Sequence, residues 1–179
     1  MNIGDKIMGD KNLQTSIAHL FLALISGHDL SKWHAGSFSH PGLHGNYFVN
    51  GILGFLHYQR GVFNTDVSQA FLFSSKATKY LALPCLMADL YKSNDLLSIL
   101  HLASGVIPYA LLLTGTEDEK LGDLVVASNV LSLCLFSYDH NRPWGWYTAA
   151  AAAFIHFVIP KMQHKQLLYP LGLSLVEYC

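Results

Sequence analysis

Two lysines, Lys76 and Lys79, lie inside a long apolar stretch of the chain and are the residues most suggestive of chemistry. They are three positions apart, so on a helix they share one face. If that helix begins near Val67, they lie about 13 to 18 Å along it, close to the middle of a membrane. Cations at that depth are costly and are usually functional or paired. The pair predicts a binding site for an anionic solute, or an ion pair with another helix.

Candidate partners for the two lysines on other helices are Asp123, Asn129 and Glu177. Asp89 is in the same helix, but ten residues from Lys79 is about 15 Å, which is too far for pairing. Asp89 is therefore expected at the opposite headgroup level, beside Tyr91 and Lys92. An alternative is that the helix starts later and the lysines extend to an interface.

Ten histidines are many for 179 residues, and four of them fall in apolar runs: His19, His57, His101 and His156. Histidines on neighbouring membrane helices can hold haem when they lie at matching depth. The expected depths permit one ligand pair at most, since only His101 falls toward the far side. We interpret these histidines as hydrogen-bonded between helices and predict no cofactor. His57, Asp89 and His101 remain candidate ligand-binding or acid/base groups.

A second group of histidines, His28, His34, His40 and His44, lies with Asp29 between the first two apolar runs. Imidazole clusters can hold zinc or copper. Their spacings of six, six and four match no defined zinc motif, so a solvated loop and no metal site are predicted. The sequence also has no nucleophile elbow, Walker loop or dinucleotide fingerprint. Catalytic residues therefore stay unassigned, and an enzyme is not the favoured interpretation.

The composition places these residues in a membrane protein. Of the 179 residues 51% are hydrophobic and 13% are charged, against about 25% charged in a typical soluble domain. The length suits a single domain, taken as residues 1–179. A net charge of −1 argues against a nucleic-acid partner, for which a basic face is expected.

Long apolar runs bounded by turn residues predict an all-α, polytopic transmembrane bundle of about six spans. The candidate spans are 15–30, 43–60, 67–91, 96–115, 121–138 and 144–161. About 20 residues cross a 30 Å hydrocarbon core, and only the third and fourth runs reach that length cleanly. The others need tilt or local thinning of the bilayer.

The basic residues of the connecting loops predict the orientation. One side holds six of them: Lys6, Lys11, Arg60, Lys120, Lys161 and Lys165. The other side holds three: Lys32, Lys92 and Arg142. This difference favours both termini in the cytoplasm. The first helix is expected to be retained, because the segment before it balances two Asp against two Lys, unlike a signal peptide.

Three functions fit this pattern. The favoured one is a non-enzymatic subunit, scaffold or assembly factor, whose partners are the lipid bilayer and other membrane proteins or copies of itself. The second is a small carrier or channel that uses Lys76 and Lys79 to meet an anionic solute. The third is a membrane-embedded enzyme acting on a lipid or quinone.

Overall fold

The computed structural model describes residues 3–32, 36–116 and 118–178, with side chains described from residue 12 onward. This part of the chain is helical and contains no strand. The α-helices are α1 (Ile3–Ser31), α2 (Asn46–Tyr58), α3 (Arg60–Phe63), α4 (Ser68–Leu90), α5 (Asp95–Leu113), α6 (Glu119–Asp139), α7 (Pro143–Ala153) and α8 (Lys165–Tyr178). A π-helix, η1 (His40–Gly45), leads into α2, while the π-helix η2 (Phe154–Val158) and the 3-10 turn η3 (Ile159–Lys161) continue α7.

Polar side chains fix the starts of helices α5 and α6. The Asn94 side chain accepts a hydrogen bond of 3.2 Å from the backbone N–H of Leu97 at the start of α5. At the start of α6, Asp118 accepts from the N–H groups of Lys120 and Leu121. Each cap satisfies donors that a helix leaves unpaired in its first turn. The short polar segments between these helices are therefore turns that reverse the chain.

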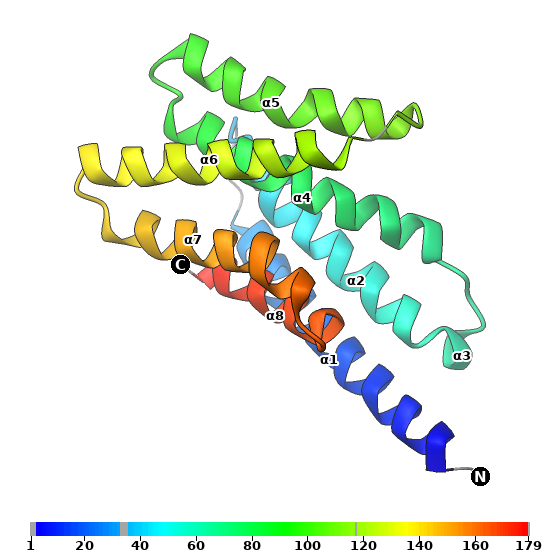
Figure 1. Ribbon diagram of the computed structural model, residues 1–179. Helices are drawn as coiled ribbons and strands as arrows, with labels where there is room; N and C mark the ends of the chain where they lie inside the picture. Colours follow the sequence, from blue (N-terminus) through cyan, green and yellow to red (C-terminus); the bar gives the residue numbers. More distant parts are fainter. Residues whose placement is uncertain (1–2, 33–35, 117, 179) are drawn as a thin grey trace.

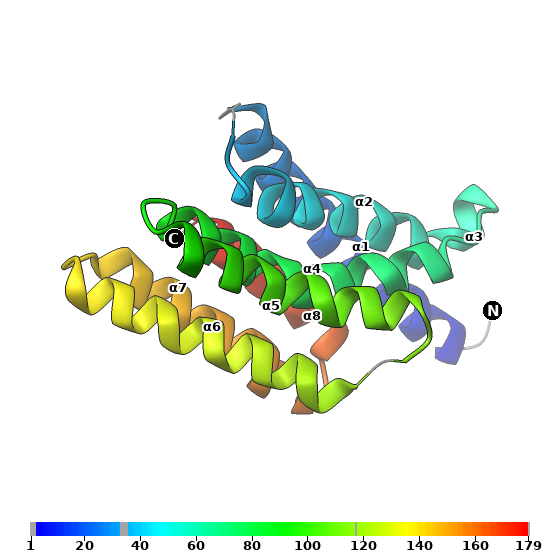
Figure 2. The same ribbon diagram turned by 90° about the horizontal axis from the view of Figure 1, so that it is seen from above.

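Six helical segments form a closed ring around the core. In order, α1 packs on α2, α2 on α4, α4 on α6, α6 on α7, α7 on α8, and α8 returns to α1 (Figures 1 and 2). The central core draws side chains from most of them, including Leu22, Tyr47, Ala82, Ile155 and Leu173. Helix α5 lies outside the ring, mainly against α4 (Figure 2). Its other main neighbour is α6.

Glycine allows one of these pairs to approach closely. A Cβ atom on Gly51 of α2 would lie 2.6 Å from the backbone nitrogen of Ala23 in α1. Real Cβ atoms essentially never come so close, so any larger residue would push the two helices apart. Small residues at such contacts are typical of helix packing in membranes.

The outer surface of the ring carries large apolar side chains. Exposed examples from the long helices are Leu13, Ile17, Leu24, Val49, Leu72, Ile99, Ile107, Leu124, Leu131, Leu135, Phe154, Leu171 and Leu175. Leu24 and Leu131 are each 65% exposed. A soluble protein rarely exposes apolar patches larger than a few hundred Å². Large apolar side chains therefore form part of the exterior of each of these helices.

The all-α prediction is confirmed for the described residues, and each of the six predicted spans coincides with a helical segment. Length and composition together mark two helices, α5 and α6, as able to cross a membrane. Core helices of soluble proteins pass the same test, so the six-span bundle is not confirmed. Helix α8 is not among the predicted spans, because Pro170 and flanking polar residues interrupt its apolar run.

Helix α8 changes the relation between the two chain ends. It runs back along α1, so that Glu177 near its end lies 2.7 Å from His44, which follows the end of α1. The start of α1 lies at the opposite end of the bundle (Figure 1). The start of α1 and the end of α8 thus lie at opposite ends of the bundle, whereas the sequence predicts six spans with both termini on one side.

Candidate functional site

Charged side chains gather where α1, α4 and α8 end, which we call the polar end. They line a cavity of about 660 Å³ together with Ser37, Ser39, His40, Leu86 and Leu90. Besides His40, the charged or titratable residues of its wall are Asp29, Lys32, His44, Asp89, Lys92 and Glu177. These six residues come from four separate stretches of the chain. Folding alone brings them together.

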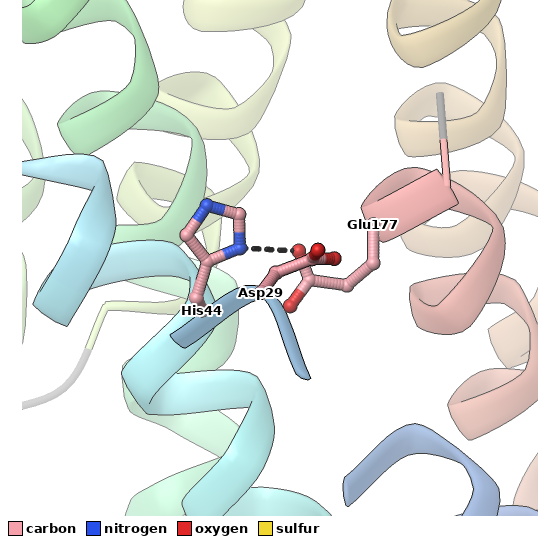
Figure 3. A group of neighbouring side chains, drawn as sticks. All are labelled: Asp29, His44 and Glu177. Carbon is pink, nitrogen blue, oxygen red and sulfur yellow. Dashed lines mark hydrogen bonds and ion pairs between the residues drawn. The ribbon is translucent and has the colours of Figure 1, made fainter. Parts of the chain in front are cut away.

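The centre of this group is formed by Asp29, His44 and Glu177 (Figure 3). His44 Nδ1 and Glu177 Oε2 are 2.7 Å apart and share a hydrogen bond. One potential ligand atom from each of the three residues lies within 4.8 Å of the other two. The Glu177 side chain is 0% exposed, and its second oxygen, Oε1, is buried without a hydrogen-bond partner.

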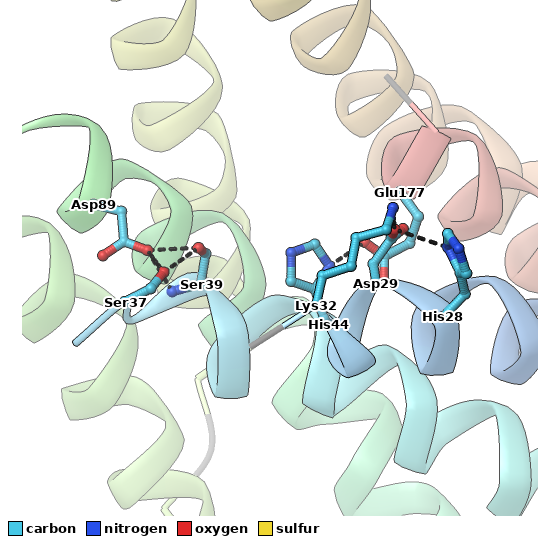
Figure 4. Close-up of polar contacts among 8 residues, drawn as sticks. All are labelled: His28, Asp29, Lys32, Ser37, Ser39, His44, Asp89 and Glu177. Carbon is cyan, nitrogen blue, oxygen red and sulfur yellow. Dashed lines mark hydrogen bonds and ion pairs between the residues drawn. The ribbon is translucent and has the colours of Figure 1, made fainter. Parts of the chain in front are cut away.

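Cationic side chains border the same group (Figure 4). Lys32 Nζ donates to Asp29 Oδ1 at 3.0 Å, and His28 Nδ1 lies 3.3 Å from the same oxygen. All of these residues lie beyond Leu24, where the exposed apolar surface of α1 ends.

Asp89 lies on the other side of the cavity and holds the loop before η1 (Figure 4). Its carboxylate accepts from the backbone N–H of Phe38 at 2.8 Å and of Ser39 at 2.7 Å. The hydroxyls of Ser37 and Ser39 donate to it as well. Lys92 fixes the same loop by donating to the carbonyl of Gly36 at 2.7 Å. The oxygens of Asp89 are thus occupied by structural hydrogen bonds.

The lysines of α4 lie away from this cavity. Lys79 Nζ forms an ion pair of 2.7 Å with Oδ1 of Asp123, one of the three partners considered from the sequence. Asp123 is one turn into α6 and its side chain is 55% exposed. Lys79 is the middle residue of α4 and lies level with the first turns of α6. Lys76 is half-buried on the same helix.

His101 joins α5 to α6 and does not reach the polar end cavity. Its Nδ1 lies 2.8 Å from Oδ1 of Asn129, and the Asn129 amide donates to Ser104 at 3.2 Å. Tyr91 stacks on the His101 ring with centroids 5.3 Å apart. Asn129 is buried, so these bonds satisfy polar groups that have no access to water. This arrangement agrees with the interpretation of the histidine as a helix-packing residue.

His57 lies at the opposite end of the bundle. It lines a second cavity, of about 640 Å³, with Tyr58, Gln59 and Arg60. Its Nδ1 is 3.2 Å from the Ser68 hydroxyl, and its ring stacks on Phe71. The five residues predicted as a site are thus distributed over four places. The structure does not bring them together.

Comparison with known proteins adds no relative. No protein family, curated protein or solved structure matches the chain. Its chemistry must be argued from its own residues.

The sequence does not predict the surroundings of two residues at the polar end, His40 and Glu177. The predicted solvated loop is wrong for His40, which is 5% exposed, while His34 lies outside the described residues. Glu177 was considered only as a partner for the lysines, and it lies 133 positions from His44. A carboxylate near the end of a short helix has no local signal that links it to a histidine so distant in sequence.

Proposed function

We propose that the chain is a multi-pass integral membrane protein with a non-enzymatic role, as a subunit, scaffold or assembly factor. The observation that carries this proposal is the apolar exterior: large aliphatic and aromatic side chains point outward from every long helix. In lipid this surface needs no further cover, and helices satisfy all their backbone groups internally.

The polar groups between helices support the same proposal. Asn50 of α2 donates to Ser75 of α4 at 2.9 Å, and Gln59 donates to Ser16 of α1 at 2.7 Å. With the Asn129 network between α5 and α6, such bonds join neighbouring helices. Hydrogen bonds across helices are a main source of specificity in membrane bundles, where lipid is as apolar as the helix surface.

We infer a topology of seven crossing segments: α1, η1 with α2, α4, α5, α6, α7 with η2 and η3, and α8. The 14 residues of α8 rise about 21 Å, so the bilayer must thin locally around this helix. Lys120, Lys161 and Lys165 start or precede helices at the same end as the N-terminus. The excess of basic residues at that end assigns the N-terminus to the cytoplasm and the C-terminus to the opposite side.

The two alternative functions receive less support from the geometry. A carrier of anions needs a cation that is free to meet the solute, but Lys79 is paired with Asp123. An enzyme needs an available acid or base, but Asp89 accepts four hydrogen bonds and His101 is bonded to Asn129. The contacts of these residues are those of structural groups.

Cysteine labelling tests the topology. In a background in which the three native cysteines are replaced by serine, Asn64→Cys and Asn94→Cys place one thiol at each end of the bundle. We expect a membrane-impermeant maleimide to label Asn94→Cys from outside the cell and Asn64→Cys only after permeabilisation. Labelling of both from one side, or release of the protein by alkaline carbonate, would refute the proposed spans.

The non-enzymatic role predicts an assembly larger than one chain. Extracted from its native membrane in a mild detergent, the protein should migrate well above its monomer mass of 19.8 kDa plus bound detergent. The same protein stripped in a harsh detergent supplies the size of the monomer as a control. Migration as a monomer in both detergents would contradict a role as a subunit or scaffold.

A further inference from the structure

The feature that reaches beyond the proposed function is the group formed by Asp29, His44 and Glu177 at the polar end (Figure 3). The three residues come from the end of α1, from η1 and from the end of α8. Their potential ligand atoms lie within 4.8 Å of one another, although no two of these residues are close in sequence. A metal ion needs such convergence of donors from several elements.

One oxygen of the Glu177 side chain lacks a hydrogen-bond partner. The side chain is fully buried, yet only one of its two oxygens has a hydrogen-bond partner. A buried carboxylate oxygen without a donor is costly, and native proteins pair almost all such atoms. A cation bound by both oxygens of the Glu177 carboxylate would satisfy Oε1 and neutralise part of the charge of two neighbouring carboxylates.

We propose that Asp29, His44 and Glu177 bind one divalent transition-metal ion of the Zn²⁺ type. The donor set is one imidazole nitrogen and two carboxylates, all of which are ordinary zinc ligands at about 2.0 to 2.2 Å. Mg²⁺ and Ca²⁺ prefer oxygen ligands throughout, so the imidazole selects against them. Three protein ligands leave a fourth tetrahedral position for water.

The present contacts are close to this geometry. Two donors on a tetrahedral Zn²⁺ ion are about 3.3 Å apart, whereas His44 Nδ1 and Glu177 Oε2 are 2.7 Å apart around a shared proton. Binding therefore replaces that proton by the metal ion and moves the two side chains apart by a few tenths of an ångström. The ion reaches them through the cavity of about 660 Å³, whose wall includes all three residues.

Lys32 competes with the metal ion for Asp29. Its ammonium group lies 3.0 Å from Asp29 Oδ1, and its side chain is 56% exposed, so it can turn out into solution. Removing this charge should strengthen metal binding, while removing a ligand should weaken it. This opposite response separates a metal site from a purely structural ion-pair cluster. The inference rests on these contacts and does not depend on the proposed membrane role.

The test is titration of Zn²⁺ into the full-length protein, purified in detergent and stripped with a chelator, by calorimetry. We expect one ion per chain. His44→Ala and Glu177→Gln should each weaken binding at least about tenfold, and Lys32→Met should strengthen it about fourfold. The exposed His140 supplies the matched control, because His140→Ala removes a histidine outside the site and should bind like wild type.

A second readout covers variants that fold poorly. Zn²⁺ should raise the melting temperature of wild type and of Lys32→Met. It should not raise that of Asp29→Asn, because a carboxamide is a weaker ligand than a carboxylate. The Asp29 side chain is partly exposed, so this substitution is chosen to leave the fold intact. The proposal is overturned if wild type binds no Zn²⁺. It is equally overturned if His44→Ala and Glu177→Gln bind as wild type does, or if His140→Ala abolishes binding.

Discussion

The polar end and the Lys79–Asp123 pair are both groups of opposite charges in an otherwise apolar bundle, yet they differ in burial and in origin. At the polar end, the Glu177 carboxylate is 0% exposed and is surrounded by residues from distant parts of the chain. The Lys79–Asp123 pair joins two helices, and Asp123 is 55% exposed. The polar end is a buried cluster assembled from several helices, whereas Lys79 and Asp123 form a partly exposed ion pair between two helices.

This difference has an energetic consequence. Exposed ion pairs contribute little, because solvent screens them and two long side chains lose freedom. Removing one partner of a buried hydrogen-bonded charge costs more, because the other group is left buried without a partner. We therefore rank the expected losses in the free energy of unfolding by the burial of each side chain and the number of its hydrogen bonds. A different measured order would contradict this difference between the two regions.

The largest effect is expected for Asp89→Ala. This change leaves two backbone N–H groups and two hydroxyls without their acceptor, so the loop before η1 loses its anchor on α4. The free energy of unfolding should fall by about 3 to 5 kcal/mol, since hydrogen bonds to a charged group are each worth about 1.5 to 3 kcal/mol. Denaturant titration in detergent measures this loss. Asp89→Asn keeps acceptor capacity and should recover part of it; a loss below about 1 kcal/mol for Asp89→Ala would show that the loop is held otherwise.

A double-mutant cycle on His44 and Glu177 should give the next largest effect. In chelator-treated protein, Glu177→Ala should cost about 2 kcal/mol, because a buried charge-assisted hydrogen bond is lost. Once His44→Ala is present, the same change should cost clearly less. The measured quantity is the coupling free energy from four unfolding curves. Additive effects of the two changes would mean that the 2.7 Å contact between them contributes nothing.

A smaller loss is expected for Asn129→Leu. It removes the hydrogen bonds that join α6 to His101 and Ser104 of α5. Such bonds between membrane helices are worth about 0.6 to 2 kcal/mol, so the unfolding free energy should fall by about 1 kcal/mol. Leu131→Ala on the outer face of α6 is the control, and it should change stability less than Asn129→Leu does.

The smallest effect is expected for Lys79→Met. The lost pair is partly exposed, so the cost should stay below about 1 kcal/mol, and the methionine side chain keeps most of the apolar contact. Asp123→Asn should have a similarly small effect. A loss of several kcal/mol in either variant would place this pair in the same class as the polar end and would remove the contrast between the two regions.

The sequence was sufficient to locate most helices because their signals are local. Apolar runs of the right length, interrupted by Gly, Pro, Asn and Asp, predicted segments that the structure builds as α1, α2 and α4 to α7. Helix α8 is not predicted from the sequence, because its 14 residues contain Pro170 and begin and end with charged or polar groups. A short helix of this kind is stabilised by packing on α1 and α7, which a linear pattern does not record.

The polar end was much less predictable, for a related reason. Asp29 and His44 were visible as part of a loop rich in histidine, but their spacing matched no motif. Glu177 reaches them only because α8 runs back along α1 to the same end of the bundle. The lysines of α4 are easier to recognise in the sequence, because a charge inside an apolar run is a local anomaly. Asp123, which pairs with Lys79, is one of the three partners that the sequence suggests.

The most direct test of the central claim, that the apolar exterior faces lipid, is the accessibility of nitroxide labels on that exterior. The labels are attached to Leu131→Cys on α6 and Ile107→Cys on α5, in protein without its native cysteines and reconstituted into lipid vesicles. Both positions are exposed, at 65% and 58%, and belong to the two helices able to cross a membrane. Both labels should collide with oxygen, which concentrates in the bilayer, more often than with a water-soluble nickel complex. More frequent collision with the nickel complex at both positions would mean that this surface faces water and not lipid.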